Sequence, residues 1–426
     1  MKKDYFSPND DEAIGYDDSL SIQNAIDLAK LKGVNKVVIP RYNRRTNSAK
    51  WVITRTILLS SDIEIVLSNC YLIMADGVVG NIFRNAAMKT EKAFKFGATE
   101  KIINQMPKPQ KNIVIRGEGY AVLDGGKSNN ILETNWKQDG YPEPVNNNII
   151  LLTGVDGFEI SDIVITNQRW WAINIRYCTY GKISDIYFYA RNTVPNQDGV
   201  HLIEGCSDIT IQRISGQSGD DFVALCAITP DYVLPEKFEA ERDIHDVQIK
   251  DIVGTSVRQA VLAMRCQDDH KMYNVAIENL IQSDGGDKNN YPYSAVVRIG
   301  SNGYFVDHEA SIGNRRNLTV KNLITPVHAA LVFCEQMQDC EFENVRQVGG
   351  WTPMYIDGVK IRNLKIKGLY ASEDITGCPI FAEHDQREDD FIENLVIEGL
   401  HYKGKNGICN LKIDEKTDIV VDGKKL

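Results

Sequence analysis

The chain has 426 residues, of which 43% are hydrophobic and 25% charged, the ordinary composition of a folded protein with a large core. Its net charge of −10 argues against nucleic acid as a partner, because nucleic acid attracts a basic face. No apolar run approaches the ~18 residues of a membrane span. Nine cysteines without disulfide-like spacing, and an N-terminus without a signal-peptide core, predict a cytoplasmic location, or secretion if a leader has been trimmed.

The N-terminal part combines one helix with the first strands. Apolar residues recur at helical spacing between residues 19 and 31, which predicts a helix capped by Ser19 or Ser21 and ended by Gly33. We expect residues 1–35 to cover the strand edges that an open β-solenoid would otherwise expose. Strand-like segments follow from Lys36 onward.

A repeat becomes plain after residue 148. Two short apolar strands joined by an Asp, Asn or Gly turn return roughly every 22 to 38 residues. Examples begin at Phe158, Ser207 and Phe391. Short strands at this period, with no helix between them, predict an all-β parallel β-helix whose inward residues are Ile, Val and Leu. We predict one domain over residues 1–426, with loop insertions and a C-terminal cap at 80–111, 125–147 and 378–426.

Three carboxylates, Asp198, Asp220 and Asp221, precede apolar strands about one repeat apart. An Asp-Asp pair alone is typical of a turn, but two acidic clusters on neighbouring coils indicate function. Carboxyl groups on such coils would lie on the order of 6 Å apart, so one should keep its proton as a general acid must. Alignment of the coils by their apolar residues predicts one column at equivalent strand starts: Trp170, Asp198, Asp221, Gln259 and, approximately, Ser294.

These motifs resemble those of glycoside hydrolase family 28, the polygalacturonase-like enzymes, over about residues 110–300. Asn196-Gln-Asp-Gly is similar to the family's Asn-Thr-Asp-Gly, and Gly219-Asp-Asp matches its Gly-Asp-Asp. The resemblance implies a right-handed, single-stranded parallel β-helix of the pectin-lyase-like kind. It also implies an inverting glycoside hydrolase for a pectin-like or other uronic-acid-containing glycan, with no metal or other cofactor. Asp220 would be the general acid, and Asp198 and Asp221 would hold and activate the attacking water.

Two departures from the family pattern concern substrate binding. The family's Gly-His-Gly reads Val257-Arg-Gln-Ala, so Arg258 or Gln259 takes the place of the histidine. The family's Arg-Ile-Lys, which holds a substrate carboxylate, reads Arg298-Ile-Gly. The resemblance therefore implies that half of the grip on a uronate is missing, and that a neutral or modified sugar is preferred there.

Other residues are candidates for the same groove. His201 follows the first acid and could face the substrate, and at most one of Trp170 and Trp171 should stack on a sugar, because neighbouring strand residues face opposite sides. Four arginines could line this face and bind carboxylate or hydroxyl groups: Arg176, Arg258, Arg265 and Arg298. Asp268-Asp-His falls in a turn away from the acids and is not expected to bind a metal.

Two other functions stay open at this stage. A polysaccharide lyase or epimerase on the same fold would give unsaturated products or depend on calcium, and a non-catalytic, phage-tail-like β-helix would bind glycan without turnover. In each case the expected partner is an oligo- or polysaccharide. The long loops ahead of the acidic coils would favour exo action on oligosaccharides. The sugar, the linkage and the oligomeric state are not predicted.

Overall fold

The structure is a computed structural model that describes residues 3–91, 101–102, 108–127, 147–191, 196–228, 241–283, 295–300, 309–326, 329–382 and 388–426. The chain forms two compact units, Met1–Leu202 with Thr229–Glu241, and Ile203–Ile228 with Arg242–Leu426. Each unit is described by itself below. Within the described residues, no helix is both long and apolar enough to cross a membrane.

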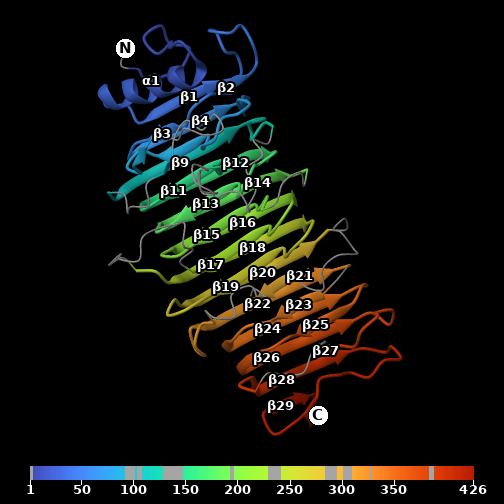
Figure 1. Ribbon diagram of the computed structural model, residues 1–426. Helices are drawn as coiled ribbons and strands as arrows, with labels where there is room; N and C mark the ends of the chain where they lie inside the picture. Colours follow the sequence, from blue (N-terminus) through green and yellow to red (C-terminus); the bar gives the residue numbers. More distant parts are fainter. Residues whose placement is uncertain are drawn as a thin grey trace. The chain divides into compact units, whose positions relative to one another are not determined.

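The first unit contains the single helix of the described residues and the strands up to β15 (Figure 1). The elements are α1 (Asp18–Leu31), β1 (Lys36–Pro40), β2 (Trp51–Ile53), β3 (Ile57–Leu59), β4 (Ile63–Ser68), β5 (Tyr71–Met74), β6 (Phe83–Asn85), β7 (Thr90–Glu91), β8 (Lys101–Ile102), β9 (Gln110–Glu118), β10 (Val122–Asp124), β11 (Ile150–Thr153), β12 (Val155–Thr166), β13 (Ile173–Arg176), β14 (Thr179–Tyr189) and β15 (Val200–Ile203).

Three ladders of parallel strands run through the first unit. One pairs β1, β4, β9, β12 and β14 in order, and the second pairs β2, β5 and β10 with the end of β12. The third pairs β3, β6, β11, β13 and β15. Each strand thus pairs with its equivalents in neighbouring coils, which is the arrangement of a parallel β-helix and confirms the predicted fold class.

The second unit continues with parallel strands in chain order, drawn from green to red in Figure 1. Its strands are β16 (Ser207–Ser218), β17 (Val223–Ala227), β18 (Ile244–Ser256), β19 (Leu262–Cys266), β20 (Met272–Gln282), β21 (Ala295–Ile299), β22 (Arg315–Thr325), β23 (Ala329–Phe333), β24 (Met337–Gln347), β25 (Thr352–Ile356), β26 (Lys360–Ala371), β27 (Ile380–Ala382), β28 (Phe391–His401), β29 (Thr417–Val421) and β30 (Lys424–Lys425).

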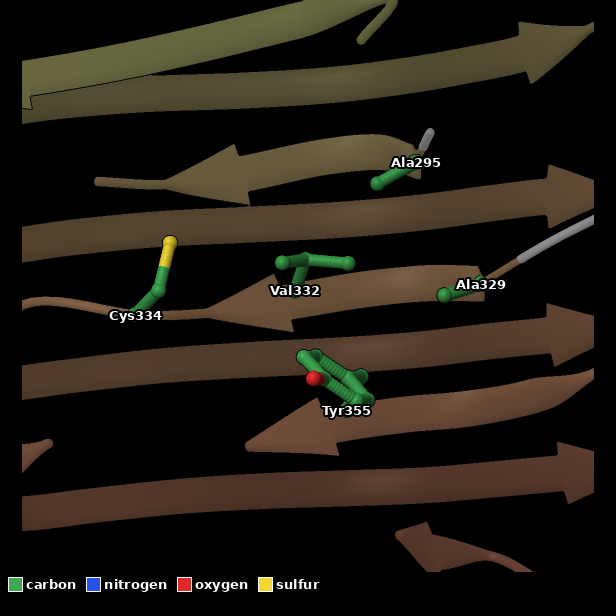
Figure 2. Close-up of a cluster of buried hydrophobic side chains, with 5 residues drawn as sticks. All are labelled: Ala295, Ala329, Val332, Cys334 and Tyr355. Carbon is green, nitrogen blue, oxygen red and sulfur yellow. The ribbon is translucent and has the colours of Figure 1, made fainter. Parts of the chain in front are cut away.

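Two ladders of the second unit differ in burial. The long strands β16, β18, β20, β22, β24, β26 and β28 pair in order, and buried residues alternate with more exposed ones along them. We call this the alternating ladder. The short strands β17, β19, β21, β23 and β25 form the buried ladder, in which nearly every residue is buried. Figure 2 shows part of its apolar packing, with Val332 and Tyr355 on neighbouring strands.

Asparagine and aspartate side chains stack at the bends of the alternating ladder. Asn344 donates to Asn322 at 2.7 Å, Asn322 to Asn279 at 2.9 Å, and Asn279 to Asp251 at 2.8 Å. All four residues have φ between 57° and 60°, a left-handed conformation that Asn and Asp tolerate better than other residues with a Cβ. The turn residues of the repeat therefore set the bend and also bind the coils together.

Several predicted boundaries differ from the structure. The helix is capped by Asp17, whose carboxylate accepts from Leu20 N at 2.7 Å, and not by Ser19 or Ser21. Strand β6 lies inside the range predicted as the first insertion and pairs with β3 and β11. Strands β27 and β28 lie inside the predicted C-terminal cap and continue the two ladders. Strand β6 has only three residues, too few to show the repeat in the sequence, whereas β28 begins at Phe391, where the sequence already showed the repeat.

The structure tests only some of the other predicted features of the domain. Helix α1 packs on β1, β2 and β3, and Ile22, Ala25, Ile26 and Ala29 are its buried apolar residues. Gly33 follows the helix with φ +65, as expected of a terminating glycine. Residues 92–100, 103–107 and 128–146 of the two predicted loops lie outside the described residues. The single domain over residues 1–426 stays a prediction.

Candidate active site

Asp198 lies two residues ahead of β15 and is 2% exposed. Its backbone carbonyl accepts hydrogen bonds from Ala172 N at 3.1 Å and from Gln168 Nε2 at 3.4 Å. Nδ1 of His201 lies 3.2 Å from Oδ2 of Asp198. The structure therefore places His201, which is itself 2% exposed, against the first acid, a contact that the sequence did not predict.

Trp171, and not Trp170, is the tryptophan beside this pair. Its ring centroid lies 4.1 Å from that of His201. Trp170 and Trp171 are only 2% and 6% exposed, so neither offers an open face for a sugar ring. Arg176, at the end of β13, is 1% exposed and lies inside the protein. These burials do not support Trp170 or Arg176 as surface contacts for a substrate.

Asp221 lies two residues ahead of β17, is fully buried and is surrounded by donors. Oδ1 accepts from Ala260 N at 3.1 Å, and Oδ2 accepts from Arg265 Nη2 at 2.9 Å. Arg298 Nη2 lies 3.1 Å from both carboxylate oxygens. A carboxylate offers about four lone-pair positions, and four donor contacts reach this one. Asp221 is therefore held firmly as an acceptor.

The adjacent Asp220 has a different environment. Its side chain is half-buried, and Oδ1 accepts from the backbone N–H of Asp221 at 2.9 Å. Its backbone carbonyl accepts from Ser218 Oγ at 2.5 Å and from Ser256 Oγ at 2.8 Å. The main chain at Asp220 is thus fixed by two hydroxyl groups, while its carboxyl group remains the more accessible of the pair.

Gln259 supports the cluster from the position that the sequence assigned to the missing histidine. Its backbone N–H donates to Ser256 Oγ at 2.8 Å, and its Oε1 accepts from Arg298 Nη1. Arg258 is half-buried beside it. Arg298 is 4% exposed and is committed to Asp221 and Gln259, so it differs from the expected open cation for a substrate carboxylate.

The predicted column is shifted by one residue on two coils. The pairs Ile173 with Val200 and Val223 with Leu262 place Trp171 level with Asp198, and Ala260 level with Asp221. Trp170 and Gln259 each precede that position by one residue. The apolar runs around Ile173 and Leu262 contain apolar residues at both parities, so the sequence allows either register. Ser294 lies outside the described residues.

Sequence reasoning placed too little weight on three groups. Arg265 was expected only as one of four arginines, although Cys226 is its partner in the register and it reaches Asp221. The hydroxyl groups of Ser218 and Ser256 were not predicted. Both hold the main chain of Asp220, and the pairing of Ser218 with Ser256 in neighbouring strands was the available signal.

The described residues contain no group of three or more His, Cys, Asp or Glu side chains that could hold a metal ion. His270 is buried, with Nε2 3.2 Å from Glu204 Oε2 and Nδ1 3.0 Å from the Gln267 carbonyl, whereas the Asp269 side chain is 87% exposed. Oδ1 of Asp269 nevertheless lies 3.7 Å from Nδ1 of His270. All nine cysteines are free thiols.

Part of the chain is similar in sequence to known proteins. Residues 83–232 match the profile of glycosyl hydrolases family 28. An exopolygalacturonase of Zea mays is 23% identical over 230 residues, which span 50% of this chain and only 54% of that relative's length.

Two solved structures share the fold. A polygalacturonase from Erwinia carotovora subsp. carotovora has a TM-score of 0.50 at 11% identity, covering 98% of this chain and 97% of its own. A mutant tailspike protein of E. coli bacteriophage HK620, in complex with a hexasaccharide, has a TM-score of 0.55 at 12% identity, covering 99% of this chain and 78% of its own. The matched segment contains Asp198, Asp220 and Asp221, so the similarity to glycosyl hydrolases family 28 includes all three acids.

Proposed function

We propose that this protein is an inverting glycoside hydrolase that cleaves a pectin-like or other uronic-acid-containing glycan. Asp220 donates a proton to the leaving oxygen, and Asp198 and Asp221 hold and activate the attacking water. The observation that carries this proposal is the contrast between two adjacent carboxyl groups. Asp221 is buried among donors and can only accept, whereas Asp220 is half-buried and accessible enough to meet a glycosidic oxygen.

Two arginines contact Asp221 and a histidine contacts Asp198, so we assign the two carboxylates different roles. Donors already occupy the lone-pair positions of Asp221, which limits its capacity to accept a proton from water. Asp198 contacts a histidine instead of two arginines. We therefore assign contact with the water and abstraction of its proton mainly to Asp198, and electrostatic stabilisation mainly to Asp221.

The environment of Gly300 supports a preference for a neutral or modified sugar where the family has a lysine. Gly300 has φ +105, and a Cβ there would lie 2.6 Å from Glu335 Cγ. Glu335 in turn forms an ion pair with the buried Arg315 at 2.8 Å. A carboxylate side chain thus packs where the family has a cation, and Arg298 is engaged by Asp221. A lysine cannot be introduced at position 300 without strain, so specificity is best tested with substrates.

The experiment is a product analysis with pectic oligosaccharides of defined composition. Proton NMR of the first-formed anomer separates inversion from retention, and ultraviolet absorbance detects the unsaturated sugars that a lyase would release. We expect inverted, saturated products, with rhamnose-containing or esterified fragments cleaved faster than polygalacturonate. Unsaturated products would contradict the proposal, and so would fragments that bind without being cleaved. Release of monosaccharides only would support the exo action that the maize relative's name suggests.

A further inference from the structure

A cavity lies in the first unit, on residues that the proposed active site does not use. It has a volume of about 330 Å³, at the lower end of the range of ligand pockets. Its wall includes Arg41, Lys50, Asn69, Tyr71 and Tyr120. We call it the Arg41–Lys50 pocket.

The two cations of this pocket have no carboxylate partner among the residues that the structure describes. Other basic residues of the same region do: Lys36 contacts Glu64 at 3.6 Å, and Arg44 contacts Asp11 at 2.5 Å. Instead, Lys50 Nζ lies 5.6 Å from the centroid of the Tyr71 ring. In a chain of net charge −10, two unpaired cations in one concave wall favour an anionic ligand.

The loop that carries both cations is fixed at its base. Trp51 Nε1 donates to the carbonyl of Pro40 at 2.7 Å, next to Arg41. Asn43, which is fully buried, donates from Nδ2 to the carbonyl of Lys50 at 3.1 Å and to Asp18 at 2.8 Å. The backbone positions of Arg41 and Lys50 are thus set before any ligand binds, which lowers the entropic cost of binding.

Tyr71 and Cys70, two of the lining residues, are uncharged. The Tyr71 hydroxyl donates to Asp124, and burial together with this contact raises the pKa of Tyr71. Asp124 also accepts from Asn167 Nδ2 at 2.9 Å and from Gly126 N at 2.7 Å. Burial raises the pKa of the Cys70 thiol to about 12, so the thiol is neutral and unreactive at ordinary pH.

The remaining wall suits a sugar better than a bare anion. Asn69 Oδ1 accepts from Tyr120 N at 3.2 Å, which leaves the amide N–H groups of Asn69 for a ligand hydroxyl. The Tyr120 side chain is 67% exposed and offers a ring face with a hydroxyl at its rim. A cavity of about 350 Å³ in the second unit is acidic instead, with Asp208 and Asp246 in its wall.

We propose that the Arg41–Lys50 pocket is a second carbohydrate-binding site, which takes a uronate residue of a glycan chain. The carboxylate of the sugar pairs with Arg41 and Lys50, its hydroxyl groups accept from Asn69, and Tyr120 packs on its ring. This proposal goes beyond the hydrolytic reaction, because it assigns a binding function to residues outside the catalytic groups.

Isothermal titration with trigalacturonate tests the proposal. All proteins carry Asp220→Asn, which prevents turnover, and hydrolysis by the protein with Asp220 is measured separately, so that failure of one proposal does not imply failure of the other. Arg41→Gln with Lys50→Gln is compared with Lys32→Gln plus Lys111→Gln. The control removes the same charge from two exposed lysines of the same unit.

We expect the pocket variant to lose one class of trigalacturonate binding, or to weaken it at least about tenfold, the loss typical of charge-assisted hydrogen bonds. The control should bind normally, and maltotriose, which is uncharged, should not bind the pocket. Tyr120→Ala should weaken the binding of trigalacturonate and leave the binding of inorganic phosphate unchanged. Trigalacturonate binding equal in both charge variants, no trigalacturonate binding at all, or phosphate binding as tight as trigalacturonate would overturn the proposal.

Discussion

The alternating ladder and the buried ladder of the second unit differ in the burial of their charged side chains. On the alternating ladder, charged side chains face solvent, as in the pair Arg362–Glu393 at 2.8 Å, whose side chains are 37% and 59% exposed. On the buried ladder, Arg298 is 4% exposed and contacts a fully buried Asp221. Burial of a charge is costly unless it is paired, so a charge on the buried ladder needs a compensating reason to be there.

The neighbours of Arg298 in its row show how this charge is accommodated. Ala263 and Val332 are its register partners, and Tyr355 follows Val332. The apolar side of the row is packed as shown in Figure 2. On the other side the register partner is Ala263, and the guanidinium of Arg298 contacts Asp221. The row therefore changes from apolar packing to a polar site within one rung.

The largest effect should come from exchanging the accessible acid. Asp220→Asn keeps the shape of the side chain and removes its proton, so we expect turnover of the best pectic fragment to fall about 10²–10⁴-fold with normal folding. Asp246→Asn, on the alternating ladder, is the matched control and should keep parental activity. A tenth or more of the parental rate in Asp220→Asn would remove Asp220 from the role of general acid.

Removal of a guanidinium should lower the free energy of unfolding more on the buried ladder than on the alternating ladder. Arg298→Ala leaves a buried carboxylate with fewer donors, and we expect a loss of about 3 kcal/mol in the free energy of unfolding, measured by denaturant titration. Arg362→Ala removes an exposed pair and should cost less than about 1 kcal/mol. Arg298→Lys, which keeps the charge and loses the contact with both oxygens, should fall between them. Equal losses at both positions would show that burial does not distinguish the ladders.

The alternating ladder could be predicted from the sequence, and the site only in part. Alternation of Ile, Val and Leu with polar residues is a local signal, so the β-helix and its inward residues followed directly. The acids also stood out, because Asp198 and Asp221 precede equivalent apolar strands. The buried ladder carries no such alternation. Ala260-Val-Leu-Ala fits two registers, and the wrong one placed Gln259 beside Asp221 instead of Ala260.

The clamp on Asp221 depends on contacts between coils that no local pattern reveals. Arg298 lies two strands away from β17 in the ladder, and its guanidinium still contacts Asp221. A sequence motif could identify Arg298 as functional, but it assigned the guanidinium to the substrate and not to Asp221. Likewise, the sequence suggests only that Gly300 replaces the family's lysine. The φ of +105 at Gly300 and the packing of Glu335 against it are structural reasons for a glycine there.

The asparagine stack provides a smaller test within the alternating ladder. Asn322→Ala removes hydrogen bonds to Asn279 and from Asn344 and places Ala at φ +60, so we expect a loss of about 2 kcal/mol in the free energy of unfolding. Asn322→Gly removes the same hydrogen bonds at a φ that glycine adopts freely, and should lose less. If Ala and Gly cost the same, the hydrogen bonds and not the left-handed backbone dominate; no loss in either would contradict a stabilising stack.

The smallest effect concerns pH and an exposed carboxylate of the alternating ladder. The hydrogen bond from His245 at 2.6 Å, and that from Asn274 at 3.1 Å, hold the pKa of Asp246 below its usual 3.8. A carboxyl group whose pKa is lowered in the folded state adds stability that is complete above the unfolded value and disappears as pH falls through the folded value. The thermal midpoint of the parent should therefore drop more than that of Asp246→Asn between about pH 5 and pH 3. Because solvent screens this site, the difference should be small and should shrink further in high salt. Parallel pH curves for the two proteins at low salt would mean that these hydrogen bonds do not favour the ionised carboxylate in the folded state.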